Sequence, residues 1–466
     1  MTARPLLIVV LAAGEGTRMK SALPKVLHRV AGQPMIESVL ANAQILRPES
    51  TVVVIGHEAE AVRSTLSSLP GHSGLTFVVQ EPQLGTAHAL LTTEAALSSA
   101  RGTLILLSGD VPMLTAETLQ RLVDRHQQSG AAATVVTATV ENPTGYGRIV
   151  RDRADGGAIA GIVEEKDASA AERTIAEINS GIYAFALDGL FDAVRTIAAQ
   201  NAQNEFYLPD LVAIYRKQGR HVETVSVAPD EIRGINSRVE LAALSRIVRQ
   251  QKVESLMAAG VTIEDPATAY IDRDVTIGAD TIVHPGVTIS GQTTIGAGCE
   301  IHSGVRIADS TLADRVVILD HCVITGSRIA SGAAVGPFAH LRNGSDVREN
   351  ARVGNFVEMK KTVLGRGSKA GHLAYLGDAT IGANVNIGAG TITCNYDGEK
   401  KQATIIEDGA FIGSDTQLIA PVTVAKDAYV GTGTTVRENV PEGALAVSAG
   451  KQRNLEGWVA KRKKKA

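Results

Sequence analysis

The stretch 271–307 reads IDRDVTIGADTIVHPGVTISGQTTIGAGCEIHSGVRI, and a branched aliphatic residue returns in it at every sixth position. This first register consists of Ile271, Ile277, Val283, Ile289, Ile295, Ile301 and Ile307. A period of six fits neither a helix of roughly 3.6 residues per turn nor a single half-buried strand. It suits a coil with three flat faces, each of which contributes one inward aliphatic residue per turn. The stretch therefore predicts a β-helical solenoid.

The repeat continues beyond residue 307 in two further registers. The second consists of Val323, Ile329, Val335, Leu341, Val347 and Val353, and the third of Ile412, Leu418, Val424, Val430 and Val436. The alternative, a β-sandwich with short strands, would need turn signals at about 8–12-residue spacing and strict apolar–polar alternation. Neither pattern is present in this part of the sequence.

Length and composition limit the classes of protein to which the chain can belong. A chain of 466 residues is expected to form two or three domains. The formal net charge of −3 gives no general attraction to nucleic acid, and no window approaches the roughly 18 apolar residues of a membrane span. Three widely separated cysteines, Cys299, Cys322 and Cys394, predict neither a disulfide framework nor a CxxC metal site, which favours the reducing cytoplasm.

Residues 1–236 alternate short apolar runs with helical patterns, as α/β domains with mostly parallel sheets do. The predicted strands are 6–11, 51–55, 77–79 and 104–108, and the predicted helices include 35–46 and 86–95. Ligands bind beyond the carboxyl ends of the strands in such sheets. We therefore expect the chemistry of this half in the loops that follow the strands.

The loop after the first strand reads LAAGEGTRMKSALPK over residues 11–25. Its glycines let backbone N–H groups approach a phosphate chain, and Arg18 and Lys25 supply positive charge. This loop is neither a GxxxxGK[ST] P-loop nor a GxGxxG fingerprint. A bare glycine-rich turn is weak support for a nucleotide site, but the added Thr-Arg-Met and Pro-Lys make the prediction more specific.

The predicted strand 104–108 leads directly into Gly109 and Asp110. A carboxylate at the carboxyl end of a strand that faces a triphosphate is a natural Mg²⁺ ligand, because Mg²⁺ prefers hard oxygen donors. Taken alone, Asp110 suits a turn or a helix cap equally well.

The stretch 11–27, LAAGEGTRMKSALPKVL, resembles the signature of sugar-nucleotide pyrophosphorylases. Joined to a hexapeptide solenoid, it resembles the family of bifunctional N-acetylglucosamine-1-phosphate uridyltransferases/glucosamine-1-phosphate acetyltransferases, and the similarity covers nearly the whole chain. The resemblance implies an α/β plus all-β fold: a Rossmann-like nucleotidyltransferase domain over 1–236, a linker helix within 237–260, and a left-handed parallel β-helix over 261–466. It also implies a homotrimer. Ser237, with Glu240 three residues later, independently predicts a helix start.

The resemblance implies a role for each matching residue of the first domain. The uracil nucleotide would be contacted by Leu11, Ala12, Ala13 and Gly14, its phosphates by Lys25, and its base by Gln80, Gly85 and Thr86. The same site would include Ser108 and Gly109. The sugar would be held by Gly147, Glu164 and Asn179, and Mg²⁺ would be bound by Asp110 and Asn236. Arg18 and Lys25 would stabilise the leaving pyrophosphate. Relatives commonly carry Tyr where this chain has Ser108, so contacts to base or ribose are expected to differ there.

The solenoid carries a dense polar set between Gly336 and Asp415 that a purely structural coil does not need. Arg342 and Lys360 suit a phosphate. Acetyl transfer to an amine needs a base of near-neutral pKa, and His372 meets that requirement. The segment 394–401 breaks the hexapeptide period, which predicts a projecting loop.

The matching family motifs extend this second site. His372 would be the base, oriented by Glu358; Tyr375 and Asn386 would hold the sugar; Asn395 and Tyr396 would contact the acceptor or the acetyl group; Ala389, Ser414 and Thr432 would contact the coenzyme A chain. This chain departs from its relatives at Thr432, where Ala is common, and at Ala449, where an Arg is common. Lys451 is a candidate for the missing charge, and the basic tail 461–465 is expected to be solvated.

The function expected from these features is acetyl-CoA-dependent acetylation of glucosamine-1-phosphate, followed by uridylyl transfer from UTP to the product. Two alternatives remain open at this stage. In one, the chain is a nucleotidyltransferase whose solenoid serves only oligomerisation or regulation. In the other, the solenoid is a scaffold for protein partners and neither site turns over.

Overall fold

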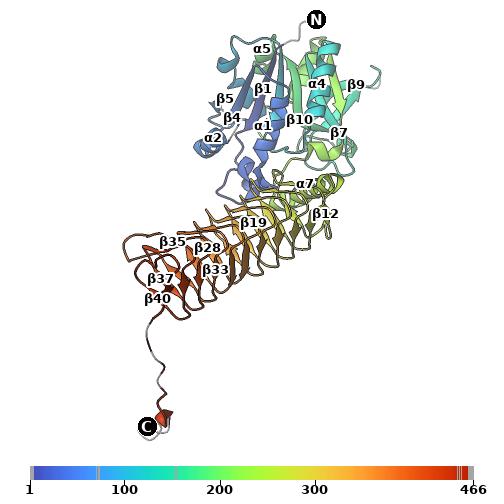
Figure 1. Cartoon of the computed structure of the whole chain (residues 1–466). Coiled ribbons are helices and arrows are strands. Elements are labelled where there is room, and N and C mark those ends of the chain that lie inside the picture. The colour runs from blue at the N-terminus through green and yellow to red at the C-terminus, as the bar shows by residue number, and fades with distance from the viewer. Residues whose placement is uncertain are drawn as a thin grey trace. The chain divides into compact units, whose positions relative to one another are not determined.

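The computed structural model describes residues 5–69, 71, 74–152, 155–448, 450, 452 and 454–459. The chain divides into two compact units, Met1–Val248 and Arg249–Ala466, and the division falls inside helix α7 (Arg238–Ala258) (Figure 1). This is the helix predicted from the Ser237 signal. The hydroxyl of Ser237 accepts a hydrogen bond from the Glu240 N–H at 3.2 Å, as a helix N-cap does.

The first unit is built on a nine-stranded sheet in which β1 is central. The strand order is β11-β7-β10-β6-β1-β4-β5, with β8 and β9 attached at β10. The strands are β1 (Leu6–Ala12), β4 (Ser50–Ile55), β5 (Leu75–Val79), β6 (Thr103–Ser108), β7 (Ala133–Thr139), β8 (Arg148–Asp152), β9 (Ala158–Val163), β10 (Glu177–Ala186) and β11 (Val222–Ser226); β2 (Arg29–Val30) and β3 (Gln33–Pro34) form a separate hairpin. Strand β1 pairs in parallel with β4 and β6, and β10 runs antiparallel to β6.

Helices cover both faces of this sheet because the residues of β1 alternate between two apolar cores. Ile8 and Val10 belong to the core that contains residues of α1, α2 and α4. Leu7 and Val9 belong to the core that contains residues of α3, α5 and α6. The helices are α1 (Met35–Ile45), α2 (Ala59–Ser68), α3 (Thr86–Leu91), α4 (Ala116–Ser129), α5 (Leu190–Arg195) and α6 (Asp210–Lys217). The result is a three-layer α/β/α unit.

The predicted strands are all observed, within two residues, as β1, β4, β5 and β6. The predicted helix 86–95 is shorter, because α3 ends at Leu91. Thr92 and Thr93 follow it, and their hydroxyls donate to the carbonyls of Ala89 and Leu90 at 2.7 Å. Such local bonds compete with continuation of a helix.

The second unit is a solenoid of three parallel sheets (Figure 1). The 11-stranded sheet holds β12 (Thr262–Ile263), β15 (Ile282–Val283), β18 (Glu300–Ile301), β21 (Val317–Ile318), β24 (Ala334–Val335), β27 (Arg352–Asn355), β30 (Lys369–His372), β33 (Asn386–Ile387), β36 (Phe411–Ile412), β39 (Tyr429–Val430) and β41 (Leu445–Ala446). The 10-stranded sheet holds β13 (Tyr270–Ile271), β16 (Thr288–Ser290), β19 (Arg306–Ala308), β22 (Val323–Thr325), β25 (His340–Leu341), β28 (Glu358–Lys360), β31 (Tyr375–Gly377), β34 (Ile392–Cys394), β37 (Gln417–Ile419) and β40 (Thr435–Val436). The third sheet holds β14 (Thr276–Ile277), β17 (Thr294–Ile295), β20 (Thr311–Leu312), β23 (Arg328–Ile329), β26 (Asp346–Val347), β29 (Val363–Leu364), β32 (Ala379–Ile381), β35 (Thr404–Ile406) and β38 (Val422–Val424).

Most coils take 17 or 18 residues. In the 11-stranded sheet Ile282 pairs with Glu300, and Glu300 pairs with Val317. Asn386 instead pairs with Phe411, 25 residues further on. The extra residues form the loop predicted over 394–401, which is closed by an antiparallel bridge between Tyr396 and Lys401.

The inward aliphatic residues form one continuous core, and they correct one predicted register. Every residue of the first and third registers is buried. In the second register Val323 is 39% exposed, whereas its neighbour Ile324 is fully buried. The reason is spacing: the buried residues before Ile324 are Leu312 and Ile318, and Leu312 follows Ile307 after only five residues.

Buried hydroxyl groups at the corners tie each coil to the next. Thr281 donates to the Gly296 carbonyl at 2.9 Å and accepts from the Cys299 N–H at 3.1 Å. Ser310 donates to the Ala308 carbonyl at 2.7 Å and accepts from the Ser327 N–H at 3.1 Å. These bonds satisfy backbone groups that the corners would otherwise leave buried without partners.

Two further observations concern the whole of the described chain. None of its described helices has the length and apolar character needed to cross a membrane. The three cysteines are all free thiols.

The pair Ile324 and Val323 tests the corrected register, because the two residues are neighbours in β22 and differ in burial. We expect Ile324→Ala to lower the free energy of unfolding by about 2–5 kcal/mol through the cavity it leaves. Val323→Ala should lower it by less than about 1 kcal/mol. Thermal unfolding followed by circular dichroism compares the two variants, and a larger loss for Val323→Ala would contradict the register.

Candidate active sites

A cavity of about 530 Å³ lies at the carboxyl ends of β1 and β6 in the first unit. Ten of the residues predicted for the nucleotide site line it: Leu11, Ala12, Ala13, Gly14, Lys25, Gln80, Gly85, Thr86, Ser108 and Asp110. These residues come from four separate segments of the chain. The parallel sheet brings them together, since β1 and β6 are neighbours and end at the same edge.

Lys25, Asp110 and Asn236 meet at one side of this site. The ammonium of Lys25 donates to Asp110 Oδ2 at 2.5 Å and to Asn236 Oδ1 at 3.2 Å. A carboxylate oxygen and an amide oxygen thus converge on one positive charge, although 126 residues separate them in the sequence. This pair of hard oxygen donors fits Mg²⁺, whose remaining positions are usually filled by phosphate oxygens and water.

Gln80 and Gly85 shape the other end of the cavity. The buried side chain of Gln80 donates to the Gly85 carbonyl at 3.0 Å and lies 3.2 Å from His88 Nδ1. Gly85 has a φ of +107°, and a Cβ there would lie 2.7 Å from the carbonyl oxygen of Phe206. Only glycine therefore fits this position without a backbone shift.

A second cavity of about 250 Å³ shares Leu11, Thr86 and Ser108 with the first. Glu164 and Asn179, predicted to hold the sugar, both line it. Oδ1 of Asn179 accepts from the Tyr183 hydroxyl at 3.0 Å and from the Gly181 N–H at 3.1 Å. Because both bonds use the oxygen, the amide nitrogen can donate to a ligand.

Glu164 is the most perturbed carboxyl of the second cavity. Burial, and then the carboxylates of Asp167 and Asp210, raise its pKa above the ordinary value. Gly147 lies against it, and a Cβ at Gly147 would approach Glu164 Oε1 to 2.9 Å. Gly147 therefore packs closely against the carboxylate and leaves room for it, while its predicted contact with the sugar stays a prediction.

The segment 203–209 was not predicted as part of the site. Gln203, Glu205 and Tyr207 line the second cavity. The hydroxyl of Tyr207 is buried and has no hydrogen-bond partner among the described residues. Burial and neighbouring carboxylates raise the pKa of Tyr207 to about 12, so the hydroxyl remains a donor at neutral pH. The available signal was weak: a polar and aromatic run, NEFY, over residues 204–207.

Four predicted residues are not among those that line the two cavities: Arg18, Gly109, Gly147 and Asn236. Arg18 is exposed on the short 3-10 helix Thr17–Met19, and it is not among the residues that line either cavity. Gly109 contributes its backbone, because its N–H donates to the Leu11 carbonyl at 2.9 Å and so fixes the end of β6 against β1.

In the second unit, four of the predicted acetyl-transfer residues form a column along one edge of the 11-stranded sheet: His372, Ala389, Ser414 and Thr432. Asn355 and His372 are direct register partners on β27 and β30. The coils that follow place Ala389, Ser414 and Thr432 at equivalent positions. Each of the three lies two residues after the inward aliphatic residue of its own strand, and these aliphatic residues pair from one coil to the next. A Cβ at Gly388 would lie 2.5 Å from the Ser414 nitrogen, so the backbones of successive coils pack closely beside this column.

His372 is held by Asn355 and not by Glu358, which corrects the prediction. Nδ1 of His372 lies 2.5 Å from Asn355 Oδ1. With Asn355 Oδ1 as the acceptor, Nδ1 donates in this contact and Nε2 keeps its lone pair. Glu358 lies on the 10-stranded sheet, where it accepts from Arg342 Nη1 at 2.8 Å. That pairing raises the pKa of Arg342.

A cluster of positive charge lies on the 10-stranded sheet beside this column. Arg342 and Lys360 each come directly after the inward residue of their strands, β25 and β28, which are neighbours in this sheet. Tyr375 lies on the next strand, β31, where it pairs with Glu358. The hydrogen bond and charge of Lys401 lower the pKa of Lys360. Several cations facing one another on open surface are typical of a site for a phosphate.

The remaining predicted residues of the second site have mixed positions. Asn386 is half-buried on β33. Asn395 is buried and donates to Asp378 Oδ2 at 2.5 Å, so its side chain holds the base of the 394–401 loop. Tyr396 is 61% exposed on that loop. Ala449 and Lys451 lie outside the described residues.

Comparison with known proteins identifies the family. The MobA-like NTP transferase domain family matches residues 8–177, and the GMPPB C-terminal domain family matches residues 271–351. The Bifunctional protein GlmU of Pelobacter propionicus is 49% identical over 458 residues, which cover 98% of each chain. The Bifunctional protein GlmU of Anaeromyxobacter sp. is 50% identical, over 99% of this chain and 94% of the relative. That of Shouchella clausii is 46% identical, over 97% of this chain and 98% of the relative. This chain belongs to the GlmU family.

The match to the GlmU relatives covers both units from end to end, so it includes the α/β half and the solenoid together. The predicted fold class, a Rossmann-like nucleotidyltransferase domain with a left-handed parallel β-helix, is confirmed.

Glu164 and its neighbour Glu165 form a matched pair for a pH test. Because burial raises the folded-state pKa of Glu164, its ionised form costs stability, and this cost grows as pH rises through that pKa. Glu164→Gln should therefore gain stability relative to the parent at pH 8 but not at pH 4.

Glu165→Gln should behave in the opposite way. Its bonds from Arg148 and from the Gly145 N–H lower the pKa of Glu165, so the stability it supplies is present at pH 8 and is lost as pH falls. Urea unfolding midpoints of both variants at the two pH values measure this. The same trend in both variants would contradict the assigned electrostatics.

Proposed function

We propose that this GlmU-family chain makes UDP-N-acetylglucosamine in two steps, one in each unit. Glucosamine-1-phosphate is first acetylated by acetyl-CoA on the solenoid, and the product then receives a uridylyl group from UTP in the α/β unit. The observation that carries the proposal is the convergence of Lys25, Asp110 and Asn236 at the mouth of the α/β cavity. We further propose that the functional domains are 1–236 and 261–466, on either side of α7.

In the uridylyl step, a phosphate oxygen of N-acetylglucosamine-1-phosphate attacks the α-phosphorus of UTP. A new P–O bond forms, the bond to the β-phosphate breaks, and pyrophosphate leaves. Asp110 and Asn236 would hold Mg²⁺, which supplies neutralisation of charge on the phosphate oxygens. The ammonium of Lys25 lies at the same point and stabilises charge on the leaving group.

The two cavities divide the recognition of this reaction. The first, with Gln80 and Gly85 at one end, takes the nucleotide, and the second takes the acetylated sugar. Asn179 Nδ2 and the Tyr207 hydroxyl donate to sugar oxygens, and ionised Glu164 accepts from a hydroxyl. Ser108 lines both cavities, so its small side chain lies close to both ligands.

In the acetyl step, the amine of glucosamine-1-phosphate attacks the thioester carbonyl of acetyl-CoA. The C–N bond forms and the C–S bond breaks. His372 Nε2 takes the proton from the amine and returns it to the sulfur, so coenzyme A leaves as its thiol. Asn355 positions the ring by fixing the proton on Nδ1. Arg342 and Lys360 hold the sugar phosphate, and the column Ala389, Ser414 and Thr432 accommodates the coenzyme A chain.

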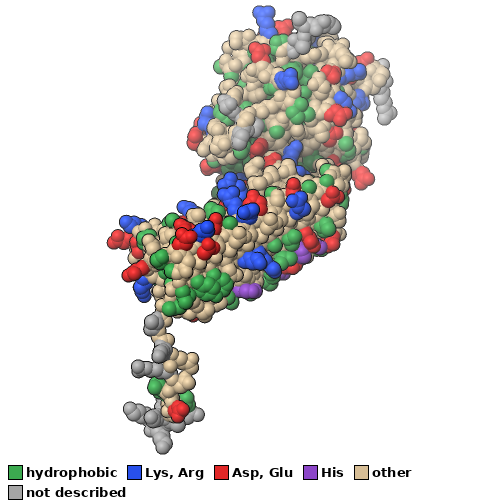
Figure 2. All heavy atoms as spheres, viewed as in Figure 1, with side chains coloured by type: hydrophobic (Ala, Val, Ile, Leu, Met, Phe, Trp, Pro, Cys, Tyr) green, Lys and Arg blue, Asp and Glu red, His purple; other side chains and the backbone are tan. Residues whose placement is uncertain are grey.

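A homotrimer is part of the proposal, and an exposed apolar ridge supports it. The ridge consists of Phe338, Phe356 and Leu373, which occupy the same corner of successive coils and are 48%, 55% and 61% exposed. Each has a φ near +50°, a conformation that costs a bulky residue about 1–2 kcal/mol. Leu373 directly follows His372, so a neighbouring subunit that covers the ridge would also enclose the base. Figure 2 shows hydrophobic side chains gathered along an edge of the solenoid.

We place the enzyme in the cytoplasm, because its three thiols are unpaired. Burial raises the pKa of Cys299 and Cys322, which keeps these thiols protonated and unreactive.

The first test is His372→Ala. Acetyl transfer should fall by about 100-fold or more, because general base catalysis contributes roughly 10²–10⁴-fold. Uridylyl transfer to supplied N-acetylglucosamine-1-phosphate should be unchanged, which serves as the control for folding. Coupled assays of coenzyme A release and pyrophosphate release measure the two reactions, and acetyl transfer above about a tenth of the parent rate would exclude His372 as the base.

The second test is Asp110→Ala, with the opposite pattern expected. Uridylyl transfer should be abolished, since the variant loses a charged metal ligand, while acetyl transfer stays near the parent rate. Loss of both activities in a folded protein would contradict two independent sites. A chain that transfers the uridylyl group but does not bind coenzyme A would instead match the alternative of a regulatory solenoid.

A further inference from the structure

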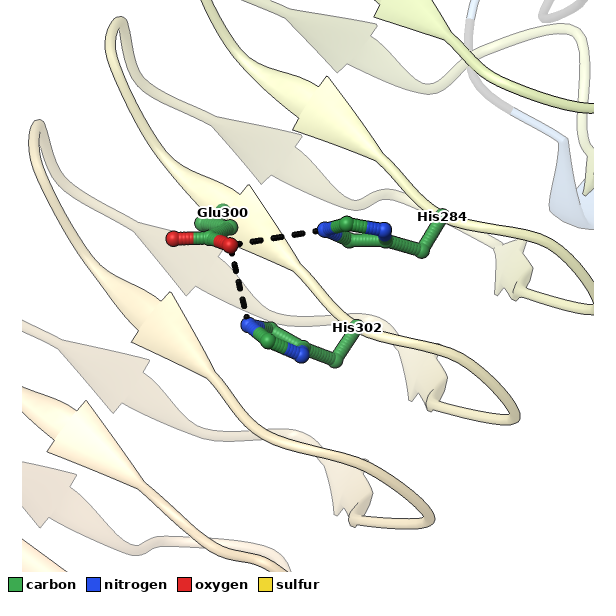
Figure 3. A group of neighbouring side chains, drawn as sticks. All are labelled: His284, Glu300 and His302. Carbon is green, nitrogen blue, oxygen red and sulfur yellow. Dashed lines mark hydrogen bonds and ion pairs between the residues drawn. The ribbon is translucent and has the colours of Figure 1, made fainter.

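Two histidines and a glutamate form a compact group on the 11-stranded sheet, several coils before the acetyl-transfer residues. His284 directly follows β15, Glu300 begins β18, and His302 directly follows β18 (Figure 3). Nε2 of His302 lies 3.1 Å from Glu300 Oε1, and Nε2 of His284 lies 3.4 Å from the same oxygen. All three ligand atoms lie within 4.8 Å of one another, and both rings point toward the carboxylate.

The outer nitrogen of each ring faces a second carboxylate. His284 Nδ1 lies 2.9 Å from Glu264 Oε2, within hydrogen-bond distance, and His302 Nδ1 lies 3.6 Å from Asp320 Oδ2. A carboxylate within hydrogen-bond distance of Nδ1, as Glu264 is for His284, favours a proton on that nitrogen. With the proton on Nδ1 in both rings, the two Nε2 lone pairs face the Glu300 oxygen, and the three electron-rich atoms converge on a point that suits a cation.

The spacing of these atoms suits a metal ion. With metal–nitrogen and metal–oxygen distances of about 2.0–2.2 Å, two ligand atoms of a tetrahedral zinc site lie roughly 3.3–3.5 Å apart. The two Nε2 atoms lie 3.1 and 3.4 Å from Glu300 Oε1. A carboxylate that orients a metal-binding histidine through its other nitrogen is also the usual outer shell of zinc sites.

We propose that His284, Glu300 and His302 bind one divalent metal ion of borderline softness, Zn²⁺ in the first instance, through two Nε2 atoms and one carboxylate oxygen. Imidazole ligands favour such ions over Mg²⁺ or Ca²⁺. Because β15 and β18 belong to consecutive coils, the bound ion cross-links those coils. The fourth position faces solvent and takes water, since the three side chains are only partly buried.

The competing reading is a row of surface ion pairs between carboxylates and protonated imidazoles. Exposed pairs of this kind contribute little to stability. The two readings differ in a measurable way, because only the metal site depends on Nε2 lone pairs and on an added ion.

The test is titration of the full-length, chelator-treated protein with ZnCl₂ by calorimetry, in buffer with excess Mg²⁺ to occupy the Asp110 site. The parent should bind one Zn²⁺ per chain with a rise in thermal unfolding temperature. His302→Ala and Glu300→Gln should each weaken binding by more than about 100-fold, and Glu264→Gln, which removes an outer carboxylate, by about 10–100-fold. His340→Ala is the matched control, because His340 is an exposed solenoid histidine on the 10-stranded sheet, and it should bind as the parent does.

Substitution of Co²⁺ gives a second readout that a structural role alone would not produce. A cobalt ion held by two imidazoles and a carboxylate in tetrahedral geometry absorbs visible light, and this band should be present in the parent and absent in His302→Ala. The proposal is overturned by no zinc binding in the parent. It is equally overturned by equal affinity in the parent, His302→Ala and Glu300→Gln.

Discussion

Every column of side chains on the solenoid depends on the hydrogen bonds between one strand and the strand 17 or 18 residues further along the chain. These bonds, and the buried aliphatic residue in each strand, fix which outward side chains stand above one another. A polar residue at one coil therefore acquires neighbours that are remote in sequence but fixed in space. The Asn355–His372 pair and the His284–Glu300–His302 group both arise in this way.

The same constraint explains why the solenoid can tolerate one large interruption. The 394–401 loop adds residues between two strands without altering the pairing on either side, because Asn386 still pairs with Phe411. Asn395 stays buried against Asp378 and anchors the loop, while Tyr396 is presented to solvent. Regular coils thus supply rigidity, and the loop supplies a surface that can reach beyond the coil.

Periodicity predicted most of the fold, because burial in this chain follows a repeat. The register failed at Val323, where a five-residue step moved the buried position to Ile324, and a strict period of six cannot show such a step. Site residues in the loops that follow β1 and β6, such as Lys25 and Asp110, were predictable, since a parallel sheet gathers its strand ends at one edge. The contacts of two other side chains were not predictable. Glu358 binds Arg342 because the two residues stand on adjacent strands of another sheet. Tyr207 lines its cavity from a loop that has no periodic signal.

The central claim is that one chain carries two chemistries in series. The most direct measurement supplies the purified protein with glucosamine-1-phosphate, UTP, Mg²⁺ and acetyl-CoA labelled in the acetyl group, and follows the label by mass spectrometry. The account predicts that the label appears first in N-acetylglucosamine-1-phosphate and then in UDP-N-acetylglucosamine, with equal release of pyrophosphate. A UDP-sugar without the label, or no acetylated sugar at all, would contradict it.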